Sequence, residues 1–192
     1  SWGGKNHYIL MPQDYGNDAD WKEHFDYLLP FFNDDRYIKE NGRPMFLIYK
    51  SKSIPNAKLM MELWDKLAIE AGFNGMFFVD TLLGKTKDYR ELPFKAHVEF
   101  EPSRTNWQQP WIILNYKRVR RYFLNMINKL FGCSIPLNSC FKFSDVAKKS
   151  LALVSPENTY GGVFAGWDNS PRRGLAATIV LPPTKEEFKT YL

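Results

Sequence analysis

The residues best suited to chemistry in this 192-residue sequence are carboxylates that lie at the ends of short apolar runs. Asp80 comes directly after the run Met76–Val79, and Glu99 lies near the end of the run His97–Phe100. Carboxylates can supply the acid, the base or the oxocarbenium stabilisation of glycosyl transfer and glycoside hydrolysis. We therefore take Glu99 and Asp80 as candidate catalytic residues. The alternatives are a surface position on an edge strand for Glu99 and a turn or helix cap for Asp80.

A second group of candidates lies in the stretch Gly161–Gly174, which reads GGVFAGWDNSPRRG. Its apolar start predicts a buried strand over Val163–Ala165 that opens into ring-bearing and charged residues. The candidate substrate-binding residues of this stretch are Trp167, Asp168, Asn169, Arg172 and Arg173. A ring can stack on a sugar, and guanidinium groups can clamp a phosphate or carboxylate. The alternative is a type I turn with solvated arginines and a core-filling tryptophan.

Three further candidate substrate-binding residues follow predicted strands. Gln13 comes after the run His7–Met11, and Tyr49 ends the apolar run Pro44–Tyr49. Glu101 lies two residues after Glu99, and its alternative is a solvated loop position.

Aromatic residues make up 16% of the sequence, which suits either a carbohydrate site or a bulky core. The net charge of +5 permits contact with anionic partners without requiring it, and we expect no nucleic-acid partner. Much of the excess lies in one predicted helix, at Lys117, Arg118, Arg120 and Arg121. This basic face could approach anionic lipid headgroups, with a solvated face as the alternative.

No metal or nucleotide motif is visible, so we expect no metal and no cofactor. The three histidines are scattered, and no GxGxxG fingerprint, Walker loop or GxSxG elbow is present.

Cys133 and Cys140 predict free thiols in a reducing cytosol, with one disulfide as the alternative. No apolar run approaches the length of a membrane span, and no signal peptide is visible. We expect a cytoplasmic protein, with peripheral contact at the inner membrane through the basic helix.

The elements that must position these residues alternate between strands and helices. Helical spacing of apolar residues predicts helices over 21–32, 56–71, 115–130, 144–153 and 184–189, and Pro30 should bend or end the first. The strand–helix–strand unit from residue 44 to residue 79 implies parallel strands. Since a (β/α)₈ barrel needs about 250 residues, the sequence predicts either an open doubly wound sheet or an incomplete barrel.

Several segments resemble the WbsX-type glycosyltransferase family, also described as glycoside hydrolase family 99-like domains of bacterial polysaccharide loci. The matching segments, in family order, are Trp2–Gly4, Gln13–Gly16, Trp21 with the LLPFF run at 28–32, Asp35–Ile38, Gly42–Pro44, Val98–Phe100 with Pro102, and Gly166–Arg173. The resemblance therefore extends over nearly the whole sequence.

This resemblance implies an α/β fold of the (β/α)₈ TIM-barrel type. The sequence would hold the central strands of an incomplete barrel, as one partial domain over 1–192 with a basic helical insertion around 107–153. The family's first strands would precede Ser1. Its last strand, with the catalytic Asn-Glu-Trp-x-x-Glu-Gly motif, would follow Leu192, and nothing similar to that motif is present here.

The resemblance also implies a function. The expected activity is glycosyl transfer in the biosynthesis of a bacterial surface polysaccharide, either the O-antigen of lipopolysaccharide or a capsule, on a sugar-nucleotide or lipid-linked substrate. A family 99-like endo-mannosidase type of glycoside hydrolase and a non-catalytic carbohydrate-binding remnant are the alternatives.

Overall fold

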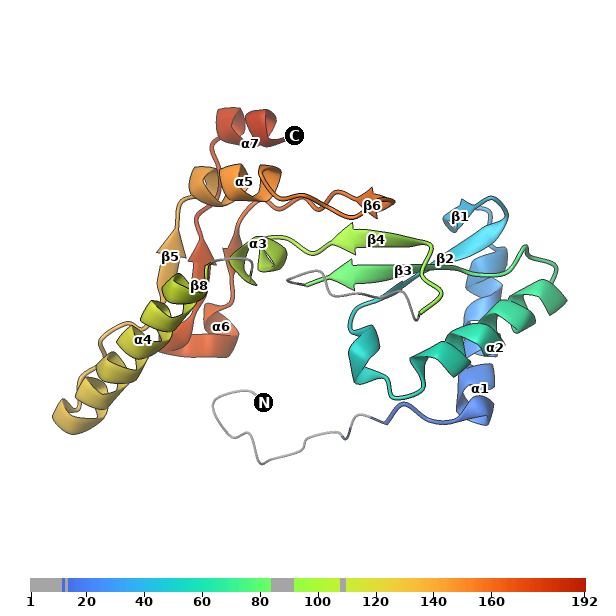
Figure 1. Cartoon of the computed structure of the whole chain (residues 1–192), viewed down its shortest axis with the longest axis horizontal. Helices are drawn as coiled ribbons and strands as arrows, with labels where there is room; N and C mark the ends of the chain where they lie inside the picture. The colour runs from blue at the N-terminus through green and yellow to red at the C-terminus, as the bar shows by residue number, and fades with distance from the viewer. Residues whose placement is uncertain (1–11, 13, 84–91, 108–109) are drawn as a thin grey trace.

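The structure, a computed structural model, describes residues 12, 14–83, 92–107 and 110–192. Gln13 and the strand predicted at 7–11 lie outside the described residues. Strands and helices alternate along most of the described chain, which confirms the predicted mixed α/β class. Figure 1 shows a larger sheet with two helices at one side and a smaller sheet with further helices at the other.

The larger sheet has five strands in the order β1-β2-β3-β4-β6. Their bounds are Lys39–Glu40 (β1), Arg43–Ile48 (β2), Phe77–Leu82 (β3), Ala96–Glu99 (β4) and Thr159–Tyr160 (β6). β1 and β2 form an antiparallel hairpin across Asn41 and Gly42, which both have the positive φ that a tight two-residue turn requires. The other four strands are parallel, so their carboxyl ends meet at one edge.

Two helices cover one face of this sheet. α1 (Asp18–Asn33) packs on α2 (Ala57–Glu70), which follows the short 3-10 turn Ser51–Ser53 and forms the crossover from β2 to β3. Trp64 of α2 is fully buried, and its indole nitrogen donates to the Trp21 carbonyl oxygen at 2.9 Å. Both tryptophans are therefore packing residues.

Helix α1 continues through Pro30 to Asn33, so of the two predicted effects of Pro30, a bend or an end, the end is wrong. The reason lies in the residues beyond the proline. Phe32 is fully buried, and its ring contacts those of Phe25 and Tyr37 at centroid distances of 5.7 and 5.1 Å. This packing holds the last turn in the helical conformation.

A smaller three-stranded sheet, in the order β5-β8-β7, lies beside the first. It contains β5 (Ser139–Phe141), β7 (Trp167–Asp168) and β8 (Thr178–Val180), and around it lie α5 (Phe143–Leu151), α6 (Ser170–Arg173), the 3-10 turn Gly174–Ala176 and α7 (Lys185–Tyr191). Phe143, Phe164 and Tyr191 pack their rings into a second hydrophobic cluster here. β5 lies between two predicted helices, where no strand is predicted.

The buried strand predicted over Val163–Ala165 is not formed. The chain instead pairs before this run, in β6, and after it, in β7, which belongs to the other sheet. Val163 is exposed, while Phe164 turns into the second cluster. The run crosses between the two sheets, and of its apolar residues only Phe164 packs into the second cluster.

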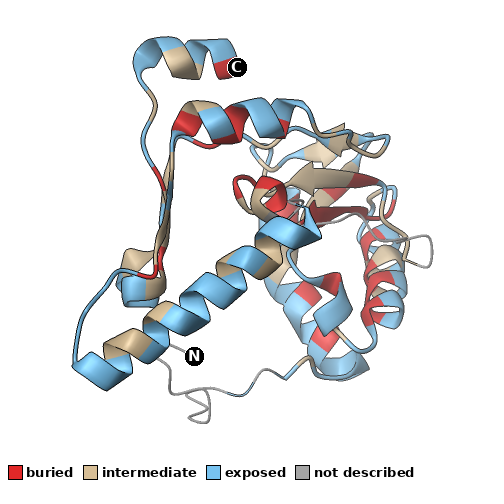
Figure 2. Cartoon of the chain, turned by 60° about the vertical axis from the view of Figure 1, so that its left-hand side comes forward, coloured by how far each residue is buried: buried red, intermediate tan, exposed pale blue. Residues whose placement is uncertain are grey.

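The segment between β4 and β5 is more helical than the sequence predicts. α3 (Ser103–Trp107) lies outside the helices predicted from the sequence, and α4 (Trp111–Phe131) begins four residues before the predicted helix. None of the residues of α4 is buried. Figure 2 shows α4 as a long helix of exposed and half-buried residues only.

Candidate functional site

Glu99 occupies the last position of β4, at the carboxyl edge of the parallel strands. Its carboxylate accepts hydrogen bonds from Arg104 Nη1 at 2.7 Å, from the Gly162 backbone nitrogen at 3.2 Å and from Ser155 Oγ. The three donors come from α3 and from the segments on either side of β6. Because its side chain is only 12% exposed, Glu99 is a nearly buried carboxylate of fixed orientation.

Arg104 lies between two glutamates and is completely buried. Its Nη1 is also 4.0 Å from Glu101 Oε1, and its Nη2 donates to the Val154 carbonyl oxygen at 2.9 Å. Glu101 is buried as well, and its Oε2 accepts from the Thr105 backbone nitrogen at 3.1 Å. The expected alternative of a solvated loop position for Glu101 is therefore wrong. Two carboxylates share one buried cation, so removing that cation would leave both uncompensated.

Asp80, the second catalytic candidate, lies in β3 and is 2% exposed. In the sheet register it stands beside Ile48 and His97, on the face that carries Phe78 and the hydrophobic cluster shared with α1 and α2. Its Oδ1 accepts from Ser51 Oγ at 3.1 Å. Burial raises the pKa of Asp80, and the Ser51 hydrogen bond and the charge of His97 act in the opposite direction. Glu99 pairs with Leu82, so it lies on the same face of the sheet as Asp80 but nearer the carboxyl edge.

A row of three aromatic rings crosses this edge of the molecule. The Tyr49 ring, just after β2, meets the Phe100 ring edge-on at 5.4 Å, and Phe100 meets Trp167 in the same manner at 6.3 Å. Tyr49 is 53% exposed, while Trp167 is partly buried against the second cluster. The structure therefore brings Tyr49 and Trp167 together through Phe100, next to Glu99 in the chain.

The polar residues after Trp167 mainly brace their own loop. Asp168 Oδ1 accepts from the Ser170 backbone nitrogen at 2.7 Å, and this bond lowers the pKa of Asp168. Asn169 Oδ1 accepts from the Thr178 backbone nitrogen at 2.8 Å. Arg172 and Arg173 are exposed at the end of α6. This arrangement resembles the turn with solvated arginines that was the alternative to a binding loop.

The sequence did not single out Arg104 or Ser155, although both contact Glu99. Ser155 lies 56 positions from Glu99 along the chain, so no local pattern predicts that contact. A signal for Arg104 did exist: it lies three residues after Glu101, on a segment that starts with a proline and a serine. Such a start favours a helix that turns the arginine back toward both glutamates.

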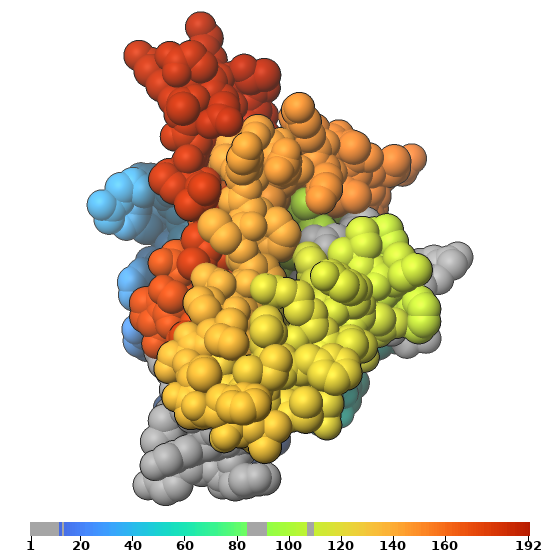
Figure 3. All heavy atoms as spheres, turned by 90° about the vertical axis from the view of Figure 1, so that its left-hand side faces the viewer, coloured from blue at the N-terminus to red at the C-terminus, as the bar shows by residue number. Residues whose placement is uncertain are grey.

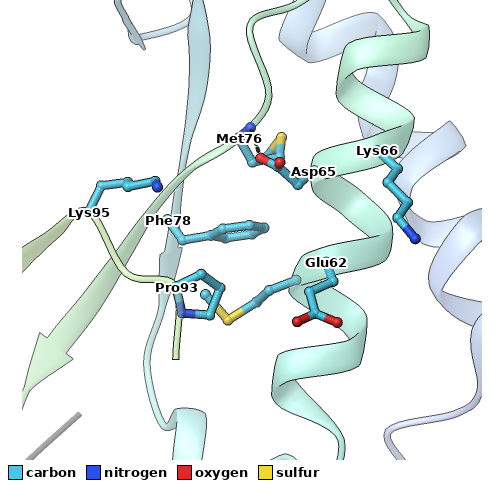
Figure 4. A pocket seen from close by; sticks show the side chains of 8 residues that line it. Glu62, Asp65, Lys66, Met76, Phe78, Pro93 and Lys95 are labelled. Carbon is cyan, nitrogen blue, oxygen red and sulfur yellow. Dashed lines mark hydrogen bonds between the residues drawn. The ribbon is translucent and has the colours of Figure 1, made fainter. Parts of the chain in front are cut away.

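A separate cavity of about 400 Å³ lies between α2 and the amino ends of β3 and β4 (Figure 4). Its lining residues are Met61, Glu62, Asp65, Lys66, Met76, Phe78, Pro93 and Lys95. Asp65 Oδ1 accepts from the Met76 backbone nitrogen at 2.8 Å, so this carboxylate is engaged in the cavity wall. Since the cavity lies away from the carboxyl ends of the strands and holds none of the candidates, it is not part of the candidate site.

Within the ranges that the structure describes, no group of three or more His, Cys, Asp or Glu side chains could hold a metal ion. Cys133 and Cys140 are free and exposed, as predicted. Among the described helices, none has the length and apolar character needed to cross a membrane.

Fold and site together define an α/β protein with buried, oriented carboxylates at the carboxyl edge of its parallel strands. The chain belongs to the WbsX glycosyltransferase family, whose profile, described as glycosyltransferase WbsX, matches residues 1–192. Similar proteins include the uncharacterized protein WxcX of two Xanthomonas campestris pv. campestris strains, B100 and ATCC 33913. Each is 23% identical over all 192 residues, and the chain spans 25% of the length of each relative. No solved structure matches the chain.

Proposed function

We propose that this protein is a glycosyltransferase that acts in the assembly of a bacterial surface polysaccharide, such as O-antigen or capsule. The observation that carries the proposal is the match to the WbsX family over the whole chain. The proposed substrates are a sugar-nucleotide or lipid-linked donor and a sugar-bearing acceptor. We propose no metal and no organic cofactor for the transfer step.

The proposed fold is a (β/α)₈ barrel of which this chain forms the central strands. Four parallel strands and the α2 crossover support it, because a barrel of this type places its site at the carboxyl ends of parallel strands. The chain would be one partial domain, with the segment around 107–153 as an insertion. The family's pair of catalytic glutamates would belong to a strand beyond Leu192.

In this proposal Glu99 is a supporting carboxylate in the substrate site. Its three hydrogen-bond donors hold it in one orientation, as stabilisation of a developing positive charge on the sugar ring requires. Tyr49 and Trp167 would stack on sugar rings from the aromatic row. Asn169 would bind a sugar hydroxyl near that row, and Gln13 stays a proposed hydroxyl-binding residue. Asp80 and Glu101, which are both buried, would help to shape the site.

The basic and acidic groups of the α6 loop have a separate proposed role. Arg172 and Arg173 are exposed and would bind the phosphate of the donor in bidentate fashion. Asp168 would bind a sugar hydroxyl while it caps the loop.

A glycoside hydrolase of the family 99-like type is the second candidate. It is favoured by one observation: Glu99 and Glu101 flank the same guanidinium group. Hydrolases of this kind use paired carboxylates with water as the acceptor.

A glycosyltransferase requires a sugar donor, whereas a glycoside hydrolase requires only water. The complete gene product that carries this chain would be incubated with nucleotide sugars and a lipid extract of its host, and the products identified by mass spectrometry. A transferase extends the lipid-linked acceptor only when the donor is present. A hydrolase releases free sugar from a polysaccharide in water alone, and this result would replace the transferase proposal.

Two variants locate the reaction at the proposed site. Glu99→Gln should lower kcat/KM by about a hundredfold if the carboxylate acts on the transition state. Tyr49→Ala, at an exposed ring, should mainly raise KM, by about tenfold, because stacking stabilises the bound sugar. The matched control is Glu157→Gln, an exposed glutamate before β6, which should leave both constants unchanged. Full activity of Glu99→Gln would remove Glu99 from the mechanism.

A further inference from the structure

Helix α4 carries a continuous apolar stripe on the side turned away from the rest of the molecule. We call this stripe the outer seam; its residues are Ile112, Tyr116, Val119, Phe123, Met126 and Leu130. They recur at alternating spacings of four and three, which places all six side chains on one face of a helix. Their exposed fractions lie between 40% and 70%. Isolated exposed apolar residues are common, but a contiguous stripe of this kind marks an interaction surface.

The opposite face of α4 is the one that contacts the protein. Lys117 Nζ lies 4.6 Å from the centre of the Phe141 ring of β5. Asn128 and Ile135 exchange two hydrogen bonds of 2.9 Å between side chain and backbone. Lys117 and Asn128 project about half a turn away from the seam. Figure 3 shows the atoms of α4 on the surface of the molecule, with the helix facing solvent along its length.

The charges of α4 narrow the choice of partner. The helix contains five basic residues, at positions 117, 118, 120, 121 and 129, and no acidic one. Arg118 and Lys129 lie along one border of the outer seam, and Arg120 lies along the other. These three side chains form no ion pair within the described residues. An apolar stripe bordered by cations is complementary to a surface with an anionic layer above an apolar layer.

We propose that α4 lies in the headgroup region of an anionic membrane, with its outer seam in the upper acyl layer and its basic borders on lipid phosphates. A helix with Lys and Arg beside a face of Trp, Phe and Leu binds membranes in the interface plane without crossing them. Trp111, Tyr116 and Tyr122 add amphipathic rings of the kind enriched at that depth. A second copy of the chain is a poorer partner, because helix pairing would bring five cations toward five with no acidic residue between them.

This placement revises the lipid contact expected from the basic residues alone. Lys117 and Arg121 belong to the side of α4 near the protein, and the pKa of Lys117 is lowered by burial and by the neighbouring cations Lys149 and Arg121. The lipid-facing set is therefore the seam with Arg118, Arg120 and Lys129. Membrane binding of this kind does not depend on the proposed glycosyl transfer, and its test uses no substrate.

Co-sedimentation with vesicles tests the proposal directly. The complete gene product is mixed with vesicles of phosphatidylcholine alone, or of phosphatidylcholine with phosphatidylglycerol. We expect the wild type to sediment with the anionic vesicles and to be released by high salt. Val119→Glu with Phe123→Glu should lower the partition coefficient by at least about tenfold. Arg118→Gln with Lys129→Gln should lower it by about fivefold per charge removed.

The matched control places the same change on another helix. Leu59 and Ile69 of α2 are 56% and 57% exposed, close to the 52% and 53% of Val119 and Phe123. Leu59→Glu with Ile69→Glu should sediment as the wild type does. Because α4 has no buried residue, we expect the seam variant to keep the wild-type urea midpoint. A wild type that stays in the supernatant with both vesicle types would overturn the proposal. So would a seam variant that changes a dimer into a monomer in light scattering, since a second copy would then cover the seam.

Discussion

At the scale of single residues, Arg104 is the side chain on which two carboxylates depend. Replacing it by methionine keeps the volume but leaves Glu99 and Glu101 buried without a cation. We expect Arg104→Met to lower the free energy of unfolding in urea by about 3–5 kcal/mol. Arg36→Met is the control, because Arg36 forms its ion pair with Asp34 at the surface and should change the midpoint little. Equal effects of the two substitutions would contradict the buried cluster.

Asp80 gives a prediction about pH. Burial raises its pKa in the folded state, so the folded protein binds this proton more tightly than the unfolded chain. The charged form therefore costs stability at neutral pH, and the cost is relieved as the pH falls through the folded-state pKa. Asp80→Asn, which can keep the hydrogen bond from Ser51, should stabilise the protein more at neutral pH than at about pH 4. Urea unfolding of both proteins at both pH values measures this effect. A stability difference between variant and wild type that is the same at the two pH values would refute the prediction.

Gly161 and Gly162 are adjacent, but only at Gly162 would a larger residue clash with its surroundings. A Cβ on Gly162 would collide with the backbone carbonyl of Glu99, whereas a Cβ on Gly161 would meet nothing within 4 Å. Gly162→Ala should therefore destabilise the protein by about 1–3 kcal/mol through backbone shifts. Gly161→Ala should be close to neutral in the same urea titration. An equal loss of unfolding free energy in the two variants would show that the close approach of residue 162 to the Glu99 backbone in β4 has no effect on stability.

At the scale of elements, the caps of α1 and α2 provide a matched pair. Asn17 caps α1 through a 2.9 Å hydrogen bond from the Ala19 backbone nitrogen, and Asp20 completes the capping box. Asn56 caps α2 without any side-chain hydrogen bond. We expect Asn17→Ala to cost about 1 kcal/mol of unfolding free energy, and Asn56→Ala to cost clearly less. The comparison uses thermal and urea unfolding, and a larger loss at Asn56 would contradict the assigned caps.

The elements that were predictable from the sequence are those with local patterns. The β2–α2–β3 unit is predictable from two apolar runs and from helical spacing between them. The pair Asn41-Gly42 is typical of the tight turn that it forms. The run at Val163–Ala165 misled because a short apolar segment does not reveal which sheet will receive it. Glu99 was found from its place at a strand end. Its donors Arg104 and Ser155 were missed, because their contacts depend on tertiary structure.

Among the described residues, the buried apolar side chains form three hydrophobic clusters, and the two largest lie in different parts of the molecule. Among the described residues, the cluster between α1, α2 and the large sheet holds ten buried residues, and the cluster around α5, β8 and α7 holds six. The parts meet at the carboxyl edge of the parallel strands. Here Arg104 donates to the Val154 carbonyl oxygen, and the Tyr191 hydroxyl donates to the Gly162 carbonyl oxygen at 3.1 Å. The residues around Glu99, including Arg104 and Gly162, thus also connect the two parts of the molecule.

Unequal clusters joined by a few polar contacts should open at different free energies, because each part loses its own buried apolar area on opening. We expect amides of α5, β8 and α7 to exchange through partial opening at low urea, while those of α2 and β3 exchange only on global unfolding. Hydrogen exchange followed by mass spectrometry, in a series of urea concentrations, measures both. In Tyr191→Phe, which lacks the hydroxyl that donates to Gly162, the opening free energy of the smaller part should fall by about 1 kcal/mol, and that of α2 should stay unchanged. If the amides of all these elements showed the same urea dependence, the two parts would unfold together as one cooperative unit. The contacts around Glu99 would then be as stable as the larger core.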